Sequence, residues 1–253
     1  MRYVKDSPLE LGFRIWQLRP PQCSLTVVVK GTFDAMAGDP APFAEEQVPA
    51  TGEMYWDDDA EMSLRTPSDY SLVKPRGECF VVGKAWAPGG RPATAVACSF
   101  KIGPVEKTFG VFGDRVWKPG MVRQLTDPAR FTEMELRMER AYGGRGHAPN
   151  PYGRGRDEVD GATLVPNLEQ PRDPIQSPGQ QVDPVIVGPL PVTWPGRAKY
   201  GGTYDQRYMN ERWPWLPADL DWRFFLEAPV DQQLHEGYWR GDERIEIQGL
   251  HPT

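Results

Sequence analysis

The sequence has only three cysteines, Cys23, Cys79 and Cys98, which are widely spaced and form no CxxC pair. An odd number of cysteines without paired spacing is typical of free thiols, so we expect no disulfide bond and a reducing, cytoplasmic location. The three histidines have no Cys or His at the spacing of metal ligands. We therefore expect no zinc or iron site.

Long hydrophobic runs and an excess of positive charge are also missing. The best apolar run covers only residues 25–29, whereas a membrane helix needs about 20 apolar residues. Charged residues interrupt residues 1–11, where a signal peptide would be apolar. With 29 Lys and Arg against 35 Asp and Glu, the net charge is −6, which disfavours nucleic acids and anionic membranes as partners. We expect no nucleic-acid partner and no stable membrane insertion.

Glycine and proline, by contrast, are abundant, with 26 and 27 of the 253 residues. This share indicates many turns and few long helices. Runs of β-branched or alternating residues between turn residues predict strands near residues 25–33, 78–86, 93–102, 105–112, 115–117, 133–140 and 242–249. One short helix is expected within residues 200–212. We predict a mainly β fold, an antiparallel β-sandwich or open, barrel-like sheets, with long Pro/Gly-rich loops and one or two short helices.

A proline-rich segment, residues 146–195, separates two groups of predicted strands. Its prolines exclude a helix or a central strand, so the segment is either a disordered linker or an ordered loop. Apolar anchors at residues 164–168 and 185–187 favour a long ordered loop wrapped over the β core. We predict a single domain over residues 1–253, with a β core at about 12–145 and 183–250.

No familiar catalytic motif occurs in the chain. It contains no Gly-x-Ser-x-Gly elbow and no Walker loop. We interpret the glycines of residues 143–146 and 153–155 as turn residues, because neither group follows a strand and opens a helix as phosphate-binding loops do. The acidic residues 57–59 lack the spacing of a calcium loop and are interpreted as a solvated turn. We expect no catalytic residue, no bound metal and no cofactor, and thus not an enzyme.

One segment leaves an alternative function open. Residues 213–224 combine tryptophans with Asp219 and Asp221, and a glycosidase uses two carboxyl groups to cleave the bond between sugars. The same tryptophans are equally suited to filling a core or holding a loop against it. The alternative is therefore a carbohydrate-active hydrolase or a carbohydrate-binding module that uses residues 213–224.

Several motifs follow one another along most of the chain from about residue 25 onward. They occupy residues 74–76, 82–92, 112–117, 139–144, 150–155, 164–169, 188–191, 202–205, 219–224 and 228–233. Each motif is short, but in this order they resemble a bacterial family known as domain of unknown function 2169 (DUF2169).

The resemblance implies a role in type VI secretion, the contractile injection machine of Gram-negative bacteria. Members of the family look like adaptors or chaperones that bind a toxic effector or a PAAR-type tip protein and help to load it onto the spike protein. The resemblance also implies that relatives are longer, so we expect a further C-terminal part beyond the present chain. It supplies no catalytic residues, and the oligomeric state is left open.

An adaptor needs aromatic and arginine anchors on its surface, because such residues dominate the energetics of interfaces. One aromatic stretch supplies the predicted anchors, Tyr204, Arg207, Trp213, Trp215 and Trp222. The residues of the family motifs are instead expected to hold loops against the core. These residues are Lys74, Pro75, Gly83, Gly113, Asp114, Arg115, Glu139, Arg140, Gly143, Gly144, Asn150, Pro151, Asn167, Asp205, Asp221, Asp231 and Gln232.

Overall fold

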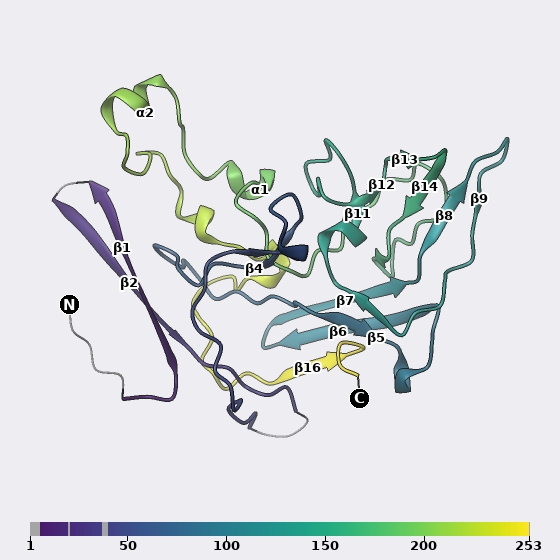
Figure 1. Ribbon diagram of the computed structural model, residues 1–253, viewed down its shortest axis with the longest axis horizontal. Coiled ribbons are helices and arrows are strands. Elements are labelled where there is room, and N and C mark those ends of the chain that lie inside the picture. Colours follow the sequence, from purple (N-terminus) through teal and green to yellow (C-terminus); the bar gives the residue numbers. More distant parts are fainter. Residues whose placement is uncertain (1–5, 20, 37–39, 253) are drawn as a thin grey trace.

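The computed structural model describes residues 6–19, 21–36 and 40–252. Strands take up 30% of it and helices 11%, and the sheets are mainly antiparallel, which confirms the predicted β fold (Figure 1). No closed barrel forms among the described residues.

The elements are short. The strands are β1 (Glu10–Arg19), β2 (Gln22–Lys30), β3 (Met54–Tyr55), β4 (Leu64–Thr66), β5 (Lys84–Trp86), β6 (Ala95–Ile102), β7 (Val105–Phe112), β8 (Arg115–Lys118), β9 (Gln124–Leu125), β10 (Glu133–Glu135), β11 (Tyr142–Gly143), β12 (Arg154–Gly155), β13 (Glu158–Val159), β14 (Ala162–Val165), β15 (Leu168–Glu169) and β16 (Ile245–Gln248). The α-helices are α1 (Pro195–Ala198) and α2 (Gln206–Glu211), and 3-10 turns lie at Trp56–Asp58, Pro88–Gly90, Met138–Arg140, Trp222–Phe225 and Val230–Gln232.

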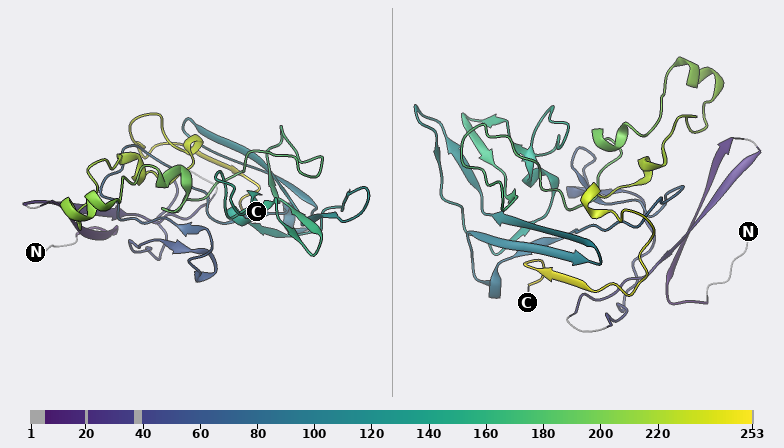
Figure 2. Two further views of the ribbon diagram at one scale, coloured as in Figure 1. Left: turned by 90° about the horizontal axis from the view of Figure 1, so that it is seen from above. Right: turned by 180° about the vertical axis from the view of Figure 1, so that it is seen from behind.

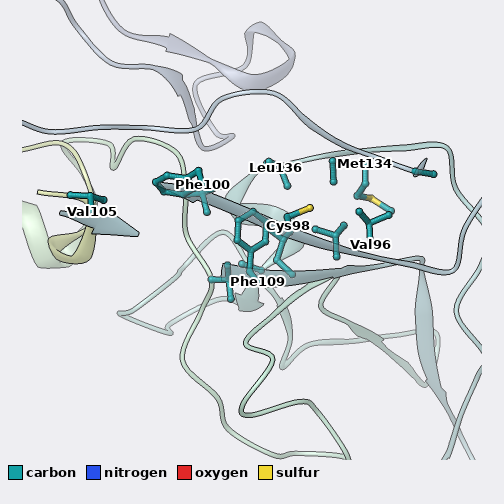
Figure 3. Packing of buried hydrophobic residues seen from close by; sticks show 14 of the residues in the cluster. Val96, Cys98, Phe100, Val105, Phe109, Met134 and Leu136 are labelled. Atoms are coloured by element: carbon teal, nitrogen blue, oxygen red, sulfur yellow. The ribbon is translucent and has the colours of Figure 1, made fainter. Parts of the chain in front are cut away.

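The hairpin of β6 and β7 forms the centre of the core. Its turn contains Gly103, whose φ of 53° is a conformation that glycine adopts without steric cost. The register sets Val96 opposite Val111 and Cys98 opposite Phe109, and all four side chains are buried. Residues directly opposite each other in an antiparallel pair share one face of the sheet. Figure 3 shows the apolar cluster that this face builds.

This hairpin is the middle of one of two four-stranded sheets. Their strand orders are β15-β7-β6-β16 and β13-β14-β8-β9. Residues 146–195 contribute β12 to β15, so the proline-rich segment supplies an edge strand to one sheet and two neighbouring strands to the other. Figures 1 and 2 place the β1–β2 ribbon and α2 at one end of the molecule and β9 at the opposite end. No helix in the described ranges has the length and apolar composition needed to cross a membrane.

Three strands differ from those predicted. The alternation over residues 133–140 gives a strand only as far as Glu135, because the chain then makes the 3-10 turn that begins at Met138. Over residues 78–86 only β5 forms, since the Cys79 N–H donates to the carbonyl oxygen of Gln232, which lies outside any strand. β1 was not predicted at all, because charged and polar residues and a glycine dilute its apolar alternation.

The three thiols are free and differ in exposure: Cys23 is exposed, Cys79 is half-buried and Cys98 is buried. Burial raises the pKa of Cys79 to about 11 and that of Cys98 to about 12. The thiolate is the reactive form, so Cys23 is expected to react first with a thiol reagent at pH 8. Titration without reductant should count one fast thiol in the native protein and all three after denaturation; a single free thiol after denaturation would refute this.

Candidate functional site

The predicted anchors lie on an arm of the chain, residues 200–225, which carries α2 and lies next to the β1–β2 ribbon (Figures 1 and 2). Polar side chains of the arm fix its shape. The Asp205 carboxylate caps α2 by accepting the Tyr208 N–H at 2.8 Å. The Thr203 N–H and hydroxyl both donate to the Asp219 carboxylate, at 3.0 and 2.7 Å. These bonds hold both sides of the arm together.

Most of the predicted anchors expose their side chains on this arm. The exposed fraction is 62% for Tyr204, 60% for Trp213 and 51% for Trp222, and the Arg207 side chain is 81% exposed. Trp215 is half-buried. Large rings normally bury their apolar surface, so the exposed rings on this arm form a candidate contact surface.

The structure brings the anchors together in two places. Tyr204 packs edge-on against Tyr208, with ring centroids 4.8 Å apart, and the Tyr208 hydroxyl donates to the Trp215 carbonyl oxygen at 2.9 Å. Trp222 instead lies at the base of the arm, where it stacks on Phe225. Phe225 in turn meets Trp16 of β1 edge-on, with centroids 6.4 Å apart. Trp222 is therefore linked through ring contacts to the β1–β2 ribbon.

An ion cluster of Lys74, Glu78, Arg197 and Glu227, in which only Lys74 is partly exposed, fixes the base of the arm. The Arg197 and Glu227 side chains are 5% and 1% exposed and meet at 3.2 Å, while Lys74 bonds to both glutamates. Arg197 also donates to the carbonyl oxygens of Phe224 and Leu190, at 2.8 and 2.7 Å. The cluster thus joins three distant segments of the chain.

The carboxylates of the ion cluster bind backbone as well as side chains. Glu78 accepts the N–H groups of both Glu227 and Ala228. Burial raises the pKa of Glu227, against the opposing effect of the Lys74 and Arg197 cations. A buried charge needs such partners, because an unpaired one costs several kcal/mol. The buried charges at the start of the arm therefore all have partners.

The two carboxyl groups of residues 213–224, those of Asp219 and Asp221, have lowered pKa values, whereas a catalytic acid needs a raised pKa. Bonds from Thr203 lower the pKa of Asp219, and the Arg223 guanidinium lowers the pKa of Asp221 to about 2. A glycosidase needs one carboxyl group with a raised pKa to protonate the leaving oxygen. Neither Asp219 nor Asp221 has the raised pKa of such an acid.

Residues of the family motifs hold loops to the β core. Buried Arg115 pairs with buried Glu169 and donates to the carbonyl oxygen of Pro166. The Asn167 amide donates to Asp114 at 2.9 Å and accepts from Arg140 at 3.3 Å. These bonds join the loop that follows β7 to the loop that precedes β15.

The same role extends to further motif residues. Glu139 accepts the N–H and hydroxyl of Ser63, and the Asn150 amide donates to the carbonyl oxygens of Met138 and Tyr142. Gln232 donates to the carbonyl oxygens of Cys79 and Val187 and accepts from Lys107, which also pairs with Asp231. Asp221 caps the 3-10 turn at Trp222–Phe225. Each of these contacts joins one segment of the chain to another.

Two of the motif glycines lie where backbone segments approach closely. A Cβ on Gly113 would lie 1.8 Å from the Ala129 carbonyl oxygen, and one on Gly143 would lie 2.1 Å from the Asn150 carbonyl oxygen. A Cβ on Gly144 would meet the Asp157 carboxylate at 2.6 Å. Gly83 has open space around it, and half-buried Pro75 and Pro151 each follow a motif residue that makes buried bonds, Lys74 and Asn150.

Two cavities among the described residues are too small to enclose a substrate. One lies between Trp56 and Met138 and the other between Trp117 and Ile175, and each has a volume of about 10 Å³. That is the space of a single water molecule. Nor do three His, Cys, Asp or Glu side chains gather anywhere in the described ranges to hold a metal ion.

Comparison with known families gives one match. Residues 22–253 match the model of a family described as "Uncharacterized protein conserved in bacteria (DUF2169)". The chain belongs to the DUF2169 family. Comparison with curated proteins and with solved structures finds nothing that matches it. The DUF2169 match takes in the aromatic arm, the ion cluster and β2, whereas β1 precedes it.

Sequence reasoning missed part of the ion cluster of this DUF2169 chain. Lys74 was predicted as structural, but Glu78 and Glu227 were not singled out, although Glu227 is among the most buried side chains. A signal was available: Glu227 lies between two apolar residues on one side and Ala-Pro-Val on the other. A charge in so apolar a run is usually buried with a partner.

Proposed function

We propose that this DUF2169 protein is a cytoplasmic, non-catalytic adaptor or chaperone of type VI secretion. It binds a cognate effector or PAAR-type tip protein and assists its loading onto the spike protein. The observation that carries the proposal is the aromatic arm, on which Tyr204, Trp213 and Trp222 are exposed while the base is fixed by buried ion pairs.

The physical argument concerns the cost of binding. Ordering a mobile loop on association costs conformational free energy, and a preorganised surface avoids that cost. The arm is held by its own capping bonds and by the ion cluster, so its exposed rings need little reordering to bind. Rings of this kind supply much contact area per residue. A chaperone stabilises its client by binding a surface that the client exposes before it is loaded.

The proposal is tested by deleting the gene in the native bacterium and measuring effector abundance, effector secretion and killing of prey cells. We expect lower effector abundance or delivery while the machine still fires. Unchanged abundance and unchanged delivery with a firing machine would overturn the proposal.

Trp213→Ala is expected to weaken binding of the purified effector by about 2 kcal/mol, or roughly 30-fold, because the exposed ring is a candidate anchor. Trp213 is a sharper test than Trp215, because the Trp215 ring is half-buried and its loss would also remove packing. Calorimetric titration measures the affinity, and thermal unfolding checks that stability is unchanged. The matched control is Val230→Ala, an exposed residue outside the arm. Equal affinity of all three proteins would remove Trp213 from the interface.

A further inference from the structure

Two arginine side chains from different segments of the chain converge on one carboxylate. Asp114 lies between β7 and β8, Arg140 ends the 3-10 turn at Met138–Arg140, and Arg154 begins β12. Asp114 Oδ1 is 3.7 Å from Nη1 of Arg140 and 3.6 Å from Nη1 of Arg154. The side chains of the two arginines are 25% and 23% exposed, and that of Asp114 is 62% exposed. The two cations therefore meet at the surface of the molecule, and we call them the arginine pair.

Hydrogen bonds to the rest of the protein hold both guanidinium groups in place. Arg154 Nε donates to the Glu139 carbonyl oxygen at 2.8 Å, and Arg140 Nη1 donates to the Asn167 amide oxygen at 3.3 Å. Asn167 is fully buried, and its amide nitrogen donates to Asp114 Oδ1 at 2.9 Å. A ligand that binds the arginine pair therefore meets a preorganised site, which lowers the cost of binding.

The arginine pair has more hydrogen-bond donors than the surrounding protein has acceptors. No described residue accepts a hydrogen bond from Nη2 of Arg140 or from either Nη atom of Arg154, and these three atoms reach solvent. Asp114 does not satisfy them, because 3.6 Å is longer than a hydrogen bond. The Nε atoms of Arg140 and of neighbouring Arg115 are buried without a partner. The solvent-facing Nη atoms are thus donors that a ligand can engage.

The charges at the arginine pair are also unbalanced. The two guanidinium groups share the carboxylate of Asp114, whereas the nearby Glu139 carboxylate is paired with Arg137 at 3.0 Å. Burial and the Arg140 cation lower the pKa of Arg154, despite these nearby carboxylates. Two cations that share one carboxylate leave one positive charge over, and an anion beside them would relieve their repulsion.

The size of this surplus selects a ligand group with a single negative charge. Guanidinium groups bind carboxylates and phosphates through parallel hydrogen bonds. A phosphate monoester carries about 1.5–2 negative charges at pH 7, which exceeds the surplus, and exposed Asp114 would repel its further oxygens. The net charge of −6 also opposes polyanions. A carboxylate matches both the charge and the planar shape of the site.

We propose that Arg140 and Arg154 bind the carboxylate group of a ligand through their solvent-facing Nη atoms beside Asp114. The carboxylate belongs to an acidic side chain or to the C-terminus of a polypeptide, which present the same group to the arginines. Figures 1 and 2 place β11 and β12 apart from α2, so the site is separate from the aromatic arm. The proposal goes beyond the adaptor function and does not rest on it.

The probes are three short peptides and inorganic phosphate. The first peptide is blocked at both ends and has one glutamate among glycines and serines, and the second has glutamine in its place. The third is the glutamine peptide with a free C-terminal carboxylate. Titrations at low ionic strength, where screening is weak, are followed by NMR through the backbone amides of residues 112–115, 139–142, 154–155 and 167.

Two substitutions change the site in opposite directions. Arg154→Gln removes one cation and should weaken binding of the glutamate peptide about tenfold. Asp114→Asn keeps an oxygen that accepts from the Asn167 amide but removes the competing negative charge, so it should tighten binding about threefold. The matched controls are Arg244→Gln and Glu246→Gln, because these exposed residues form an ion pair of their own at 3.4 Å. Neither control should change the affinity.

Tighter binding of either carboxylate peptide than of the blocked glutamine peptide supports the proposal, and the tighter of the two identifies the source of the carboxylate. Equal affinity for all three peptides would overturn it, as would tighter binding of phosphate than of both carboxylate peptides. Weaker binding by Asp114→Asn would also overturn it, because Asp114 would then build the site and not compete for it. Thermal unfolding checks each variant. If Arg154→Gln does not fold, the direction of the Asp114→Asn effect decides.

Discussion

Replacing Arg197 by alanine is expected to lower the free energy of unfolding by about 3–5 kcal/mol, the cost of breaking a buried ion pair from one side. The substitution leaves Glu227, which is 1% exposed, with one cation fewer, and it leaves the carbonyl oxygens of Leu190 and Phe224 without their donor. Each of these groups then carries an uncompensated desolvation cost. Urea unfolding followed by tryptophan fluorescence measures the change.

Arg207→Ala is the matched control for Arg197→Ala. Arg207 also pairs with a glutamate, Glu211, at a similar distance of 3.1 Å, but both side chains are largely exposed. Water and salt screen exposed pairs, so the free energy of unfolding should not change measurably. If both variants were equally stable, the ion cluster would not fix the base of the arm.

The strongly alternating parts of the fold were predictable from the sequence. β6, β7 and β8 follow the residues whose apolar alternation or β-branched run predicted them, because more and less buried side chains alternate along each strand. β16 also forms where alternation predicted it, although all four of its residues are exposed. Short strands such as β11 and β12 were not predictable from the sequence, since two residues carry no periodicity. Asn150, which lies between the two strands in the sequence, donates to the carbonyl oxygen of Tyr142 in β11.

The candidate site was predictable in part. The aromatic stretch of the sequence identified the arm, because residues that are close together in the sequence stay on one short segment, which a helix cap holds in shape. The ion cluster joins residues 74–78, 197 and 227, and no pattern within a single stretch reveals contacts over such separations. The β1–β2 ribbon was missed in part for a different reason: β2 shows its β-branched run, but its partner β1 mixes apolar residues with Gly12 and Arg14.

Gly113→Ala is expected to lower the free energy of unfolding by about 3 kcal/mol, at the upper end of what overpacking costs. The new Cβ would lie 1.8 Å from the Ala129 carbonyl oxygen, a backbone atom that cannot move aside as a side-chain end can. Backbone bonds tie Ala129 to Asp114 and Phe131 to Ala93, so the displaced segment carries its neighbours with it. Gly52→Ala is the control: its Cβ would meet nothing within 4 Å, and there alanine should be neutral or stabilise by about 0.4–1 kcal/mol. Urea unfolding of the two variants measures the difference between their free energies of unfolding. Equal stability would mean that the loop between β9 and β10 yields freely, and Gly113 would then have no structural role.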